Sequence, residues 1–248
     1  MIFVTGDTHG SIDIGKVAEF AEKNPDLTKD DYLIVCGDFG LLWNWDSMGI
    51  SIDSNPNDKQ WTPREVQLAE WYDSLPFTTL FVDGNHENFN RLNAYPVTEW
   101  CGGKVHKITD SIIHLMRGQV YDIDGKTVFT FGGAASHDRG PATGTEWLDE
   151  GLIWWPEEIS SQEERDEAIN NLNEHGNSVD LIITHCLSDR HLLAIGYADF
   201  NVTTNFLWNV EETVDFKAWY CGHYHRDMQI TSKIRCLYQD IVDVSQQR

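Results

Sequence analysis

The chain has 248 residues, 41% of them hydrophobic and 23% charged, which is enough to bury a sizeable core and is typical of a globular protein. Its net charge of −22 argues against general electrostatic binding to nucleic acid or to an anionic membrane, because such binding depends on Lys and Arg. No apolar run could span a bilayer, and no signal-peptide pattern accompanies the first strand. We therefore expect a cytoplasmic protein with no membrane partner and no stable nucleic-acid complex; nothing in the composition indicates an oligomeric state.

Strand and helix patterns alternate through the first third of the chain. The expected elements are a strand over 2–5, a helix over 13–23, a strand over 32–36, a helix over 63–74 and a strand over 79–82. Thr62 and Pro63 predict the start of the second helix, because Thr is a favoured N-cap and Pro is favoured at the first helical position. Residues 48–60, which contain "DSNPND", are expected to form a surface loop.

The pattern changes to short β segments over 104–131, where Asp124-Gly125 predicts a hairpin turn. Helical periodicity returns over 161–174, and the last third is expected to consist of strands that end in a hairpin over 228–238. Within it, "NVTTNFLWN" (201–209) is interpreted as a rim loop of no fixed role. No linker or repeat divides the chain, so we expect a single domain over 1–248 with two packed sheets and helices outside them.

Five short apolar runs end in polar residues. These residues are Asp7 and His9, Asp38, Asn85 and His86, His185, and His223 with His225. Uninterrupted apolar runs are typical of strands covered on both faces, and ligands gather at the carboxyl ends of such strands in layered α/β folds. A lone residue of this kind is usually a core histidine or a helix cap, but five occurrences in one chain predict a shared site.

The chemistry of this set favours divalent metals. Carboxylate, amide and imidazole ligands suit Mn, Fe, Zn or Ni better than a soft thiolate metal, and Mn fits best. The ligands are too many for one ion, whereas two ions that share a carboxylate would use all of them. Such two-metal sites serve displacement at phosphorus. The five cysteines have no CxxC spacing, and we interpret them as small buried thiols; the alternative would make Cys186 or Cys221 a ligand.

The motifs Asp7-x-His9, Gly37-Asp38, Gly84-Asn85-His86-Glu87, His185 and Gly222-His-x-His225 resemble the calcineurin-like metallophosphoesterases, in particular small bacterial and phage-type members. The resemblance implies a four-layer αββα sandwich, with two mixed β-sheets flanked by helices. It also implies two metal sites. The first would be held by Asp7, His9, Asp38 and His225, and the second by Asp38, Asn85, His185 and His223, with Asp38 bridging. His86 would contact the phosphate and assist the leaving group as the catalytic residue.

The expected function is hydrolysis of phosphodiesters or small phosphate esters, nucleotides among them, by in-line attack of a hydroxide that bridges the two ions. The segment "GDFGLLW" lacks the Arg of the GDxVDRG motif found in protein phosphatases of this superfamily, which lowers the alternative of a phosphomonoesterase or protein phosphatase. A non-catalytic interaction module on the same fold is a further alternative. Such modules typically lose metal ligands or the phosphate-contacting His, and here all of them are present.

The Gly-rich segment over about 132–160 is predicted to act as an active-site lid. Arg139 is then expected to contact phosphate in place of the missing arginine, and Trp154 or Trp155 to stack on a base. The alternative, which we favour slightly, is that both Trp residues anchor the loop by packing beneath it. Trp43 and Trp45 follow the bridging Asp38 and are candidates for a pocket wall or for ordinary packing.

Overall fold

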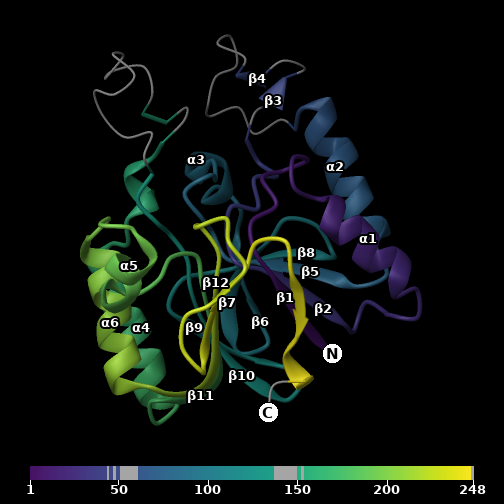
Figure 1. Ribbon diagram of the computed structural model, residues 1–248. Coiled ribbons are helices and arrows are strands. Elements are labelled where there is room, and N and C mark those ends of the chain that lie inside the picture. Colours follow the sequence, from purple (N-terminus) through teal and green to yellow (C-terminus); the bar gives the residue numbers. More distant parts are fainter. Residues whose placement is uncertain (44, 47–48, 51–60, 137–149, 152–153, 247–248) are drawn as a thin grey trace.

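The computed structural model describes residues 1–43, 45–46, 49–50, 61–136, 150–151 and 154–246. Its main elements are two β-sheets with helices on their outer faces (Figure 1). The seven-stranded sheet has the order β15 (Ile241–Asp243), β1 (Ile2–Thr5), β2 (Tyr32–Val35), β5 (Thr78–Phe81), β8 (Ile112–Leu115), β7 (Gly103–Lys107) and β6 (Val97–Trp100). The six-stranded sheet has the order β13 (Met228–Gln229), β14 (Ile234–Cys236), β12 (Asp215–Cys221), β11 (Ser178–Thr184), β10 (Lys126–Phe131) and β9 (Gln119–Ile123).

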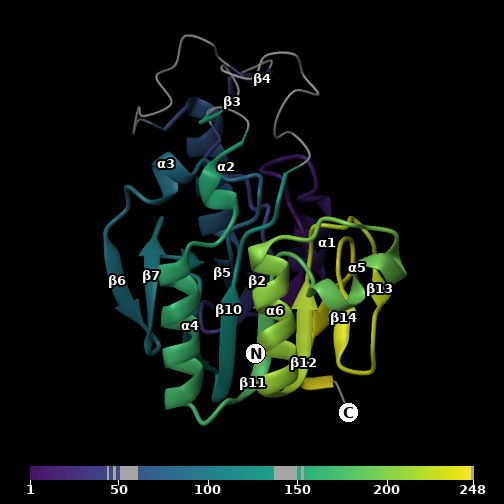
Figure 2. The ribbon, with the colours of Figure 1, turned by 90° about the vertical axis from the view of Figure 1, so that its left-hand side faces the viewer.

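The helices form two outer layers. On one side are α1 (Gly15–Lys23) and α2 (Pro63–Ser74), with the short α3 (Phe89–Leu92) near the upper end of the seven-stranded sheet (Figure 1). On the other side α4 (Gln162–Glu174), α5 (Asp189–Ile195) and α6 (Val202–Thr213) cover the six-stranded sheet, as Figure 2 shows. Two 3-10 turns, η1 (Pro156–Glu158) and η2 (Val244–Gln246), and a two-stranded ribbon of β3 (Trp45–Asp46) and β4 (Gly49–Ile50) complete the described elements.

Alternation along each strand divides the core into layers, because successive strand residues point to opposite faces. In β1, Ile2 and Val4 belong to the buried cluster between the two sheets, whereas Phe3 belongs to the cluster under α1 and α2. In β11 the division is the same: Ile183 packs between the sheets and Ile182 faces the helices of the other side. These packing layers confirm the predicted αββα sandwich of two mixed sheets.

Several local predictions are confirmed. The helix over Pro63–Ser74 begins with Thr62 in a complete capping box with Glu65. Asp124 and Gly125 both have positive φ, 51° and 70°, and join β9 to β10 as a tight hairpin. The 161–174 helix begins one residue later, with Ser161 as its cap.

Other predictions need correction. The stretch 201–209 is not a loop, because residues from Val202 onward form α6; Asn201 caps it by accepting the N–H groups of Thr203 and Thr204 at 2.8 and 3.2 Å. The last third therefore contains helices as well as strands. The first helix begins at Gly15 instead of residue 13. The loop predicted over 48–60 lies mostly outside the described residues, and Gly49–Ile50 within it form β4.

All five polar motifs follow parallel strands at one edge of the sandwich. β1, β2 and β5 are parallel neighbours in one sheet, and β11 and β12 are parallel neighbours in the other. The N-terminus lies at the lower side of Figure 1, so these strands run toward the upper side, where α3 lies. Among the described residues, no helix is long and apolar enough to cross a membrane.

Candidate metal centre

Seven polar side chains from the five motifs come together at this edge. We call Asp7, His9, Asp38, Asn85, His185, His223 and His225 the polar cluster. Within it, potential ligand atoms of Asp7, His9, Asp38 and His225 all lie within 4.8 Å of one another, and so do those of Asp38, His185 and His223. Asp38 belongs to both groups. The structure thus brings together all the residues predicted as metal ligands, with the predicted carboxylate at their centre.

In the first group, two imidazoles approach two carboxylates. His225 Nε2 lies 3.1 Å from Asp7 Oδ2, and His9 Nε2 lies 3.3 Å from Asp38 Oδ2. His9 turns its other nitrogen, Nδ1, to Asp13 Oδ2 at 2.8 Å. That bond to Asp13 directs Nε2 of His9 into the cluster.

In the second group, His185 is fully buried and is held from both sides. Its Nδ1–H donates to the Cys36 carbonyl at 2.7 Å, which leaves Nε2 to face the cluster. Nε2 lies 3.2 Å from Asp38 Oδ1 and 3.1 Å from Asn85 Oδ1. The His223 ring lies edge-on to the His185 ring at 4.9 Å.

The glycines of the motifs make this convergence sterically feasible. A Cβ on Gly84 would lie 2.1 Å from Asp38 Oδ1, and a Cβ on Gly222 would lie 2.1 Å from Asp7 Oδ1. A Cβ on Gly37 would lie 2.3 Å from His185 Nδ1. In each case the Gly of one motif leaves room for the polar side chain of another.

The backbone of the cluster is unusual as well. His9, Asp38, His223 and His225 have φ values of 45°, 48°, 70° and 50°, in the left-handed region that non-glycine residues rarely occupy. Such conformations cost free energy and persist where surrounding contacts enforce them, most often at functional sites. Four of the seven members of the polar cluster share this feature.

Opposite charges determine the protonation of the cluster. Burial alone would lower the pKa of His185, but the carboxylates of Asp38 and Asp7 raise it to about 10. Burial likewise opposes the charged form of His9, and Asp38, Asp7 and Asp13 raise its pKa to about 9. Burial would raise the pKa of Asp38, yet His185, His86 and His9 hold it well below its ordinary value. In the absence of metal, His9 and His185 are therefore expected to carry protons that balance the negative charge of the neighbouring carboxylates.

The geometry fits divalent cations. Two ligands that lie at right angles around an ion, each about 2.1 Å from it, are about 3 Å apart. The separations between imidazole nitrogen and carboxylate or amide oxygen in the cluster are 3.1–3.3 Å. The donor set, oxygen plus imidazole without thiolate, is one that Mn, Fe, Zn and Ni share.

Comparison with known proteins identifies the family. The family model for calcineurin-like phosphoesterases matches residues 1–227. The chain belongs to the calcineurin-like phosphoesterase family. The motifs predicted this membership, and the potential metal ligands that they predicted converge in the polar cluster.

The individual proteins that resemble this chain are only distantly similar to it. Lariat debranching enzyme A of Xenopus laevis is 31% identical over 106 residues, which are 42% of this chain and 19% of that protein. The chain thus spans about a fifth of the length of this relative. The crystal structure of the phosphopantetheinyl hydrolase PptH from Mycobacterium tuberculosis is 16% identical, with a TM-score of 0.37 over 96% of this chain and 87% of that one.

His86 occupies a different position from the seven members of the cluster. Its backbone N–H donates to Asp38 Oδ1 at 2.7 Å, while its ring is only partly buried and lies 5.4 Å from the His9 ring. The next residue, Glu87, is buried and accepts the backbone N–H of Phe39 at 2.7 Å and that of Gly40. Glu87 thereby ties the loop after β5 to the loop that follows Asp38.

An aromatic group adjoins His86. Trp43, Phe89 and Trp155 form a small buried cluster, in which the Trp43 ring lies 5.3 Å from Trp155 and 5.7 Å from the His86 ring. Trp155 is only 1% exposed, which favours the anchoring alternative over base stacking for this residue. Trp154 is partly buried. Arg139 and the side chain of Trp45 lie outside the described residues.

The ends of the predicted lid segment are held together. Ser136 N–H and Trp155 N–H donate to the two carboxylate oxygens of Glu158, both at 3.0 Å, and Glu158 is fully buried. Gly133 N–H donates to the Asp83 carbonyl at 2.9 Å, which joins the start of the segment to the loop that carries Asn85 and His86. Residues 137–149 and 152–153 lie outside the described residues, so the lid itself stays a prediction.

The cysteines are thiols away from the ligand atoms. Cys36, Cys186, Cys221 and Cys236 are free and buried as predicted, whereas Cys101 is free but only partly buried; no Cys takes part in the metal-ligand groups found among the described residues. Burial raises the pKa of Cys186 to about 12 and that of Cys221 well above its ordinary value. Both thiols are therefore protonated near neutral pH, as the structural interpretation of the cysteines predicted.

Sequence reasoning missed the residues that hold members of the polar cluster, or the loops that carry them, in position. Asp13 and Lys16 both fell inside the predicted first helix over 13–23, and Tyr238 ended the predicted C-terminal hairpin; none was singled out. Asp13 lies four residues after His9, but the predicted helix begins only at residue 13, so this spacing did not predict their contact. Asp83 and Arg117, a buried ion pair next to the Asn85 loop, had no local signal, since 34 residues separate them.

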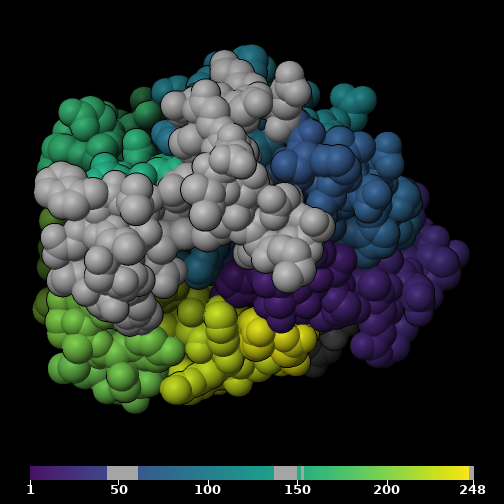
Figure 3. Space-filling view, turned by 90° about the horizontal axis from the view of Figure 1, so that it is seen from above, coloured from purple at the N-terminus to yellow at the C-terminus, as the bar shows by residue number. Residues whose placement is uncertain are grey.

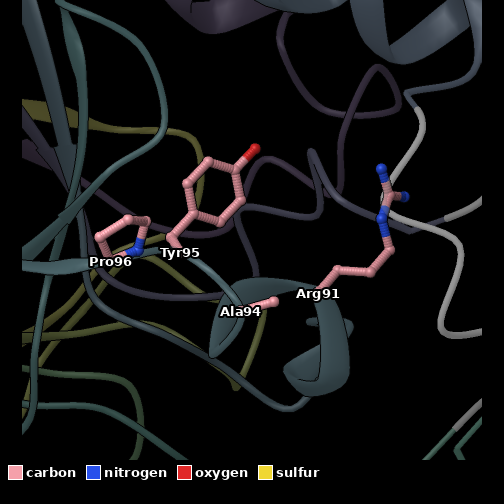
Figure 4. A pocket seen from close by; sticks show the side chains of 4 residues that line it. All are labelled: Arg91, Ala94, Tyr95 and Pro96. Atoms are coloured by element: carbon pink, nitrogen blue, oxygen red, sulfur yellow. The ribbon is translucent and has the colours of Figure 1, made fainter.

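A separate cavity of about 280 Å³ lies beside α3 (Figure 4). Arg91, Ala94, Tyr95 and Pro96 line it, and none of these residues belongs to the polar cluster. Arg91 is itself engaged, since its guanidinium pairs with the buried carboxylate of Glu65. The cavity adds nothing to the chemistry of the polar cluster.

Proposed function

We propose that this phosphoesterase is a dinuclear metal-dependent hydrolase of phosphodiesters or small phosphate esters, nucleotides among them. The observation that carries the proposal is the shared carboxylate: Asp38 lies within ligand distance of both groups of the polar cluster. We further propose Mn as the most suitable metal, with Fe, Zn or Ni as alternatives. Two bound ions would supply Lewis acidity at the phosphoryl oxygens and a nucleophile derived from water.

The members of the polar cluster would act as ligands of two different ions. We assign Asp7, His9, Asp38 and His225 to the first ion, and Asp38, Asn85, His185 and His223 to the second. Asp38 suits the shared position because only a carboxylate can bridge while offsetting the charge of both ions. Asn85 offers a neutral oxygen, which would leave the second ion more electrophilic.

His86 is proposed as the catalytic acid. Its backbone is fixed by Asp38, and its ring is partly exposed and lies outside both ligand groups. In its protonated form the ring can donate to the oxygen of the leaving group as that oxygen gains charge. Such a contribution is typically about 10²–10⁴-fold in rate.

Leaving-group dependence tests this role. Wild type and His86→Ala would be assayed with Mn²⁺ on bis-p-nitrophenyl phosphate and on a dinucleoside phosphate. A nitrophenolate needs little help from an acid, whereas an alkoxide needs much. We therefore expect His86→Ala to lose about 10²-fold or more on the dinucleoside phosphate and clearly less on the nitrophenyl ester, with both metals retained. Equal losses on both esters would contradict the acid role.

A matched control is His175→Ala. His175 is exposed at the end of α4 and bonds its own helix through the Asn171 carbonyl, so this variant should keep full activity.

Comparison of bis-p-nitrophenyl phosphate with p-nitrophenyl phosphate separates the diesterase from the alternative of a phosphomonoesterase or protein phosphatase. Two bound metals without turnover of any ester would favour the non-catalytic interaction module.

A further inference from the structure

Tyr238 lies beyond residue 227, where the match to the family model ends, yet its ring covers a member of the polar cluster. The Tyr238 ring stacks on the imidazole of His225, with centroids 4.8 Å apart and planes inclined by 15°. His225 is half exposed, since 50% of its side chain is accessible. The His225 ring also lies edge-on to the His9 ring at 4.9 Å and places Nε2 3.1 Å from Asp7 Oδ2, while the phenol of Tyr238 stacks on its face.

The hydroxyl of the same tyrosine reaches the other imidazole of the first group. Tyr238 OH donates to Asp13 Oδ1 at 3.0 Å, and Asp13 Oδ2 accepts from His9 Nδ1 at 2.8 Å. A carboxylate behind a ligating His fixes the ring and its tautomer, so that the second nitrogen is presented to the metal. Tyr238 therefore contacts His225 with its face and supports His9 through Asp13 with its hydroxyl.

Tyr238 is itself held firmly in place. Both carboxylate oxygens of Asp227 accept backbone N–H groups of the turn that carries Tyr238: Tyr238 at 2.8 Å, Gln239 at 3.0 Å and Asp240 at 2.9 Å. Lys16 Nζ donates to the carbonyls of Tyr238, Gly6 and Asp7, which ties this turn to the end of β1. Figure 3 shows the C-terminal chain, in yellow, lying beside the N-terminal chain, in purple, on this face.

We propose that Tyr238 is a positioning residue that orients His9 and His225 together, and that the C-terminal segment thereby sets the affinity of the first metal site. This inference rests on the proposed function, because it assumes that the two groups bind metal. Apart from Asp38, which both groups share, the residues of the second group are held by other contacts: His185 by the Cys36 carbonyl, and the His223 ring by that of Tyr224 at 4.9 Å. The effect is therefore confined to one of two ions.

The test is a Mn²⁺ titration of the full chain, read out as bound metal per chain and by the EPR spectrum, which distinguishes a coupled pair of ions from a single one. The variants are Tyr238→Phe, which keeps the stacked ring, and Tyr238→Leu, which removes both contacts. Tyr95→Phe is the control, because it also deletes one tyrosine hydroxyl, which accepts from Trp61 Nε1 at 3.0 Å, away from the cluster.

We expect Tyr238→Leu to lower the affinity of the first site for Mn²⁺ by about 10–100-fold and to leave that of the second site unchanged. At Mn²⁺ concentrations between the two dissociation constants, the variant should show the EPR spectrum of a single ion. Tyr238→Phe should fall between Tyr238→Leu and wild type, and Tyr95→Phe should match wild type. If Tyr238→Leu does not fold, Asp13→Ala must show the same selective loss. Wild-type affinity for both ions in folded Tyr238→Leu would overturn the inference. A wild type that binds fewer than two ions would instead refute the proposed function.

Discussion

Gly84 has no side chain, yet the polar cluster depends on it. A Cβ at this position would lie 2.1 Å from Asp38 Oδ1 and 2.2 Å from the Asp38 backbone nitrogen, and backbone cannot give way as a flexible side chain does. We expect Gly84→Ala to displace Asp38 and to lose at least one bound metal together with the proposed phosphoesterase activity. Metal analysis after gel filtration measures this. Gly15→Ala is the control, because its Cβ would meet nothing within 4 Å; it should bind metal normally and be equally stable or slightly more stable.

His106, which lies outside the polar cluster, is expected to make the free energy of unfolding depend on pH. It is 3% exposed, and burial together with the neighbouring His114, whose Nδ1 lies 3.1 Å from its own, lowers its pKa from 6.5 to about 4. The folded state therefore binds fewer protons than the unfolded state between these values, so stability is lost as the pH falls from about 6.5 toward 4.

The matching variant is His106→Gln, which keeps an N–H donor but cannot titrate. In urea titrations of metal-free protein, the loss of unfolding free energy between pH 7 and pH 4 should be smaller in the variant by up to about 3 kcal/mol. Identical pH profiles for wild type and His106→Gln would show that this imidazole does not contribute.

At the residue scale the sequence was most informative where each motif carries its own signal. A polar residue after an apolar run can be recognised locally, and that is how all seven members of the polar cluster were found. Tyr238 and Asp13 could not be paired in this way, because their contact joins positions 225 residues apart and depends on how β14 and β15 return to β1. No spacing in the chain encodes that return.

Among the elements, the end of β5 is held by a buried ion pair. Arg117 donates through Nε to Asp83 Oδ2 at 2.8 Å, and its Nη2 also donates to the Glu157 carbonyl at 2.7 Å. His114 Nε2 contacts the other Asp83 oxygen at 3.2 Å. This guanidinium therefore links the loop after β5, which continues into Asn85 and His86, to the 3-10 turn η1.

Removing one partner of this pair leaves a buried charge uncompensated. We expect Arg117→Met to lower the unfolding free energy by about 3–5 kcal/mol, measured by urea or thermal denaturation. Arg190→Met is the surface control, since the Arg190 side chain is 51% exposed and pairs with the exposed Glu212; it should cost at most about 1 kcal/mol. A loss of less than 1 kcal/mol in Arg117→Met would contradict the linking role.

Element prediction failed where the tertiary environment outweighed local pattern. The stretch "VTTNFLWN" begins with β-branched residues, which have lower helix propensity, and it was interpreted as a loop. In the structure Asn201 caps the helix, and Phe206, Leu207 and Val210 pack into the core under the six-stranded sheet. By contrast, α2 and α4 were predicted well because their caps and periodicity agree with their final environment.

At the scale of the whole molecule, we expect divalent cations bound at the polar cluster to stabilise the fold of this strongly acidic chain, whose net charge is −22. Asp7 and Asp38 are buried close together at the edge where both sheets meet, and cations that bind only the folded state stabilise it by mass action. At a free Mn²⁺ concentration about 100 times the dissociation constant, the gain is about 2.7 kcal/mol.

For a chain of this length, that gain should raise the melting temperature by about 5–10 °C over the chelator-treated protein. Differential scanning calorimetry with and without Mn²⁺ measures the shift. Asp38→Asn should lose most of it, whereas Asp166→Asn, on the exposed surface of α4, should retain it. An equal shift in Asp38→Asn and wild type would mean that the ions bind elsewhere.

The central claim is that one carboxylate serves two ions, and anomalous diffraction from crystals grown with Mn²⁺ tests it most directly. We predict two anomalous peaks about 3.5–4 Å apart on either side of the Asp38 carboxylate. One should be coordinated by Asp7, His9 and His225, and the other by Asn85, His185 and His223. A single peak, or peaks remote from Asp38, would contradict the account.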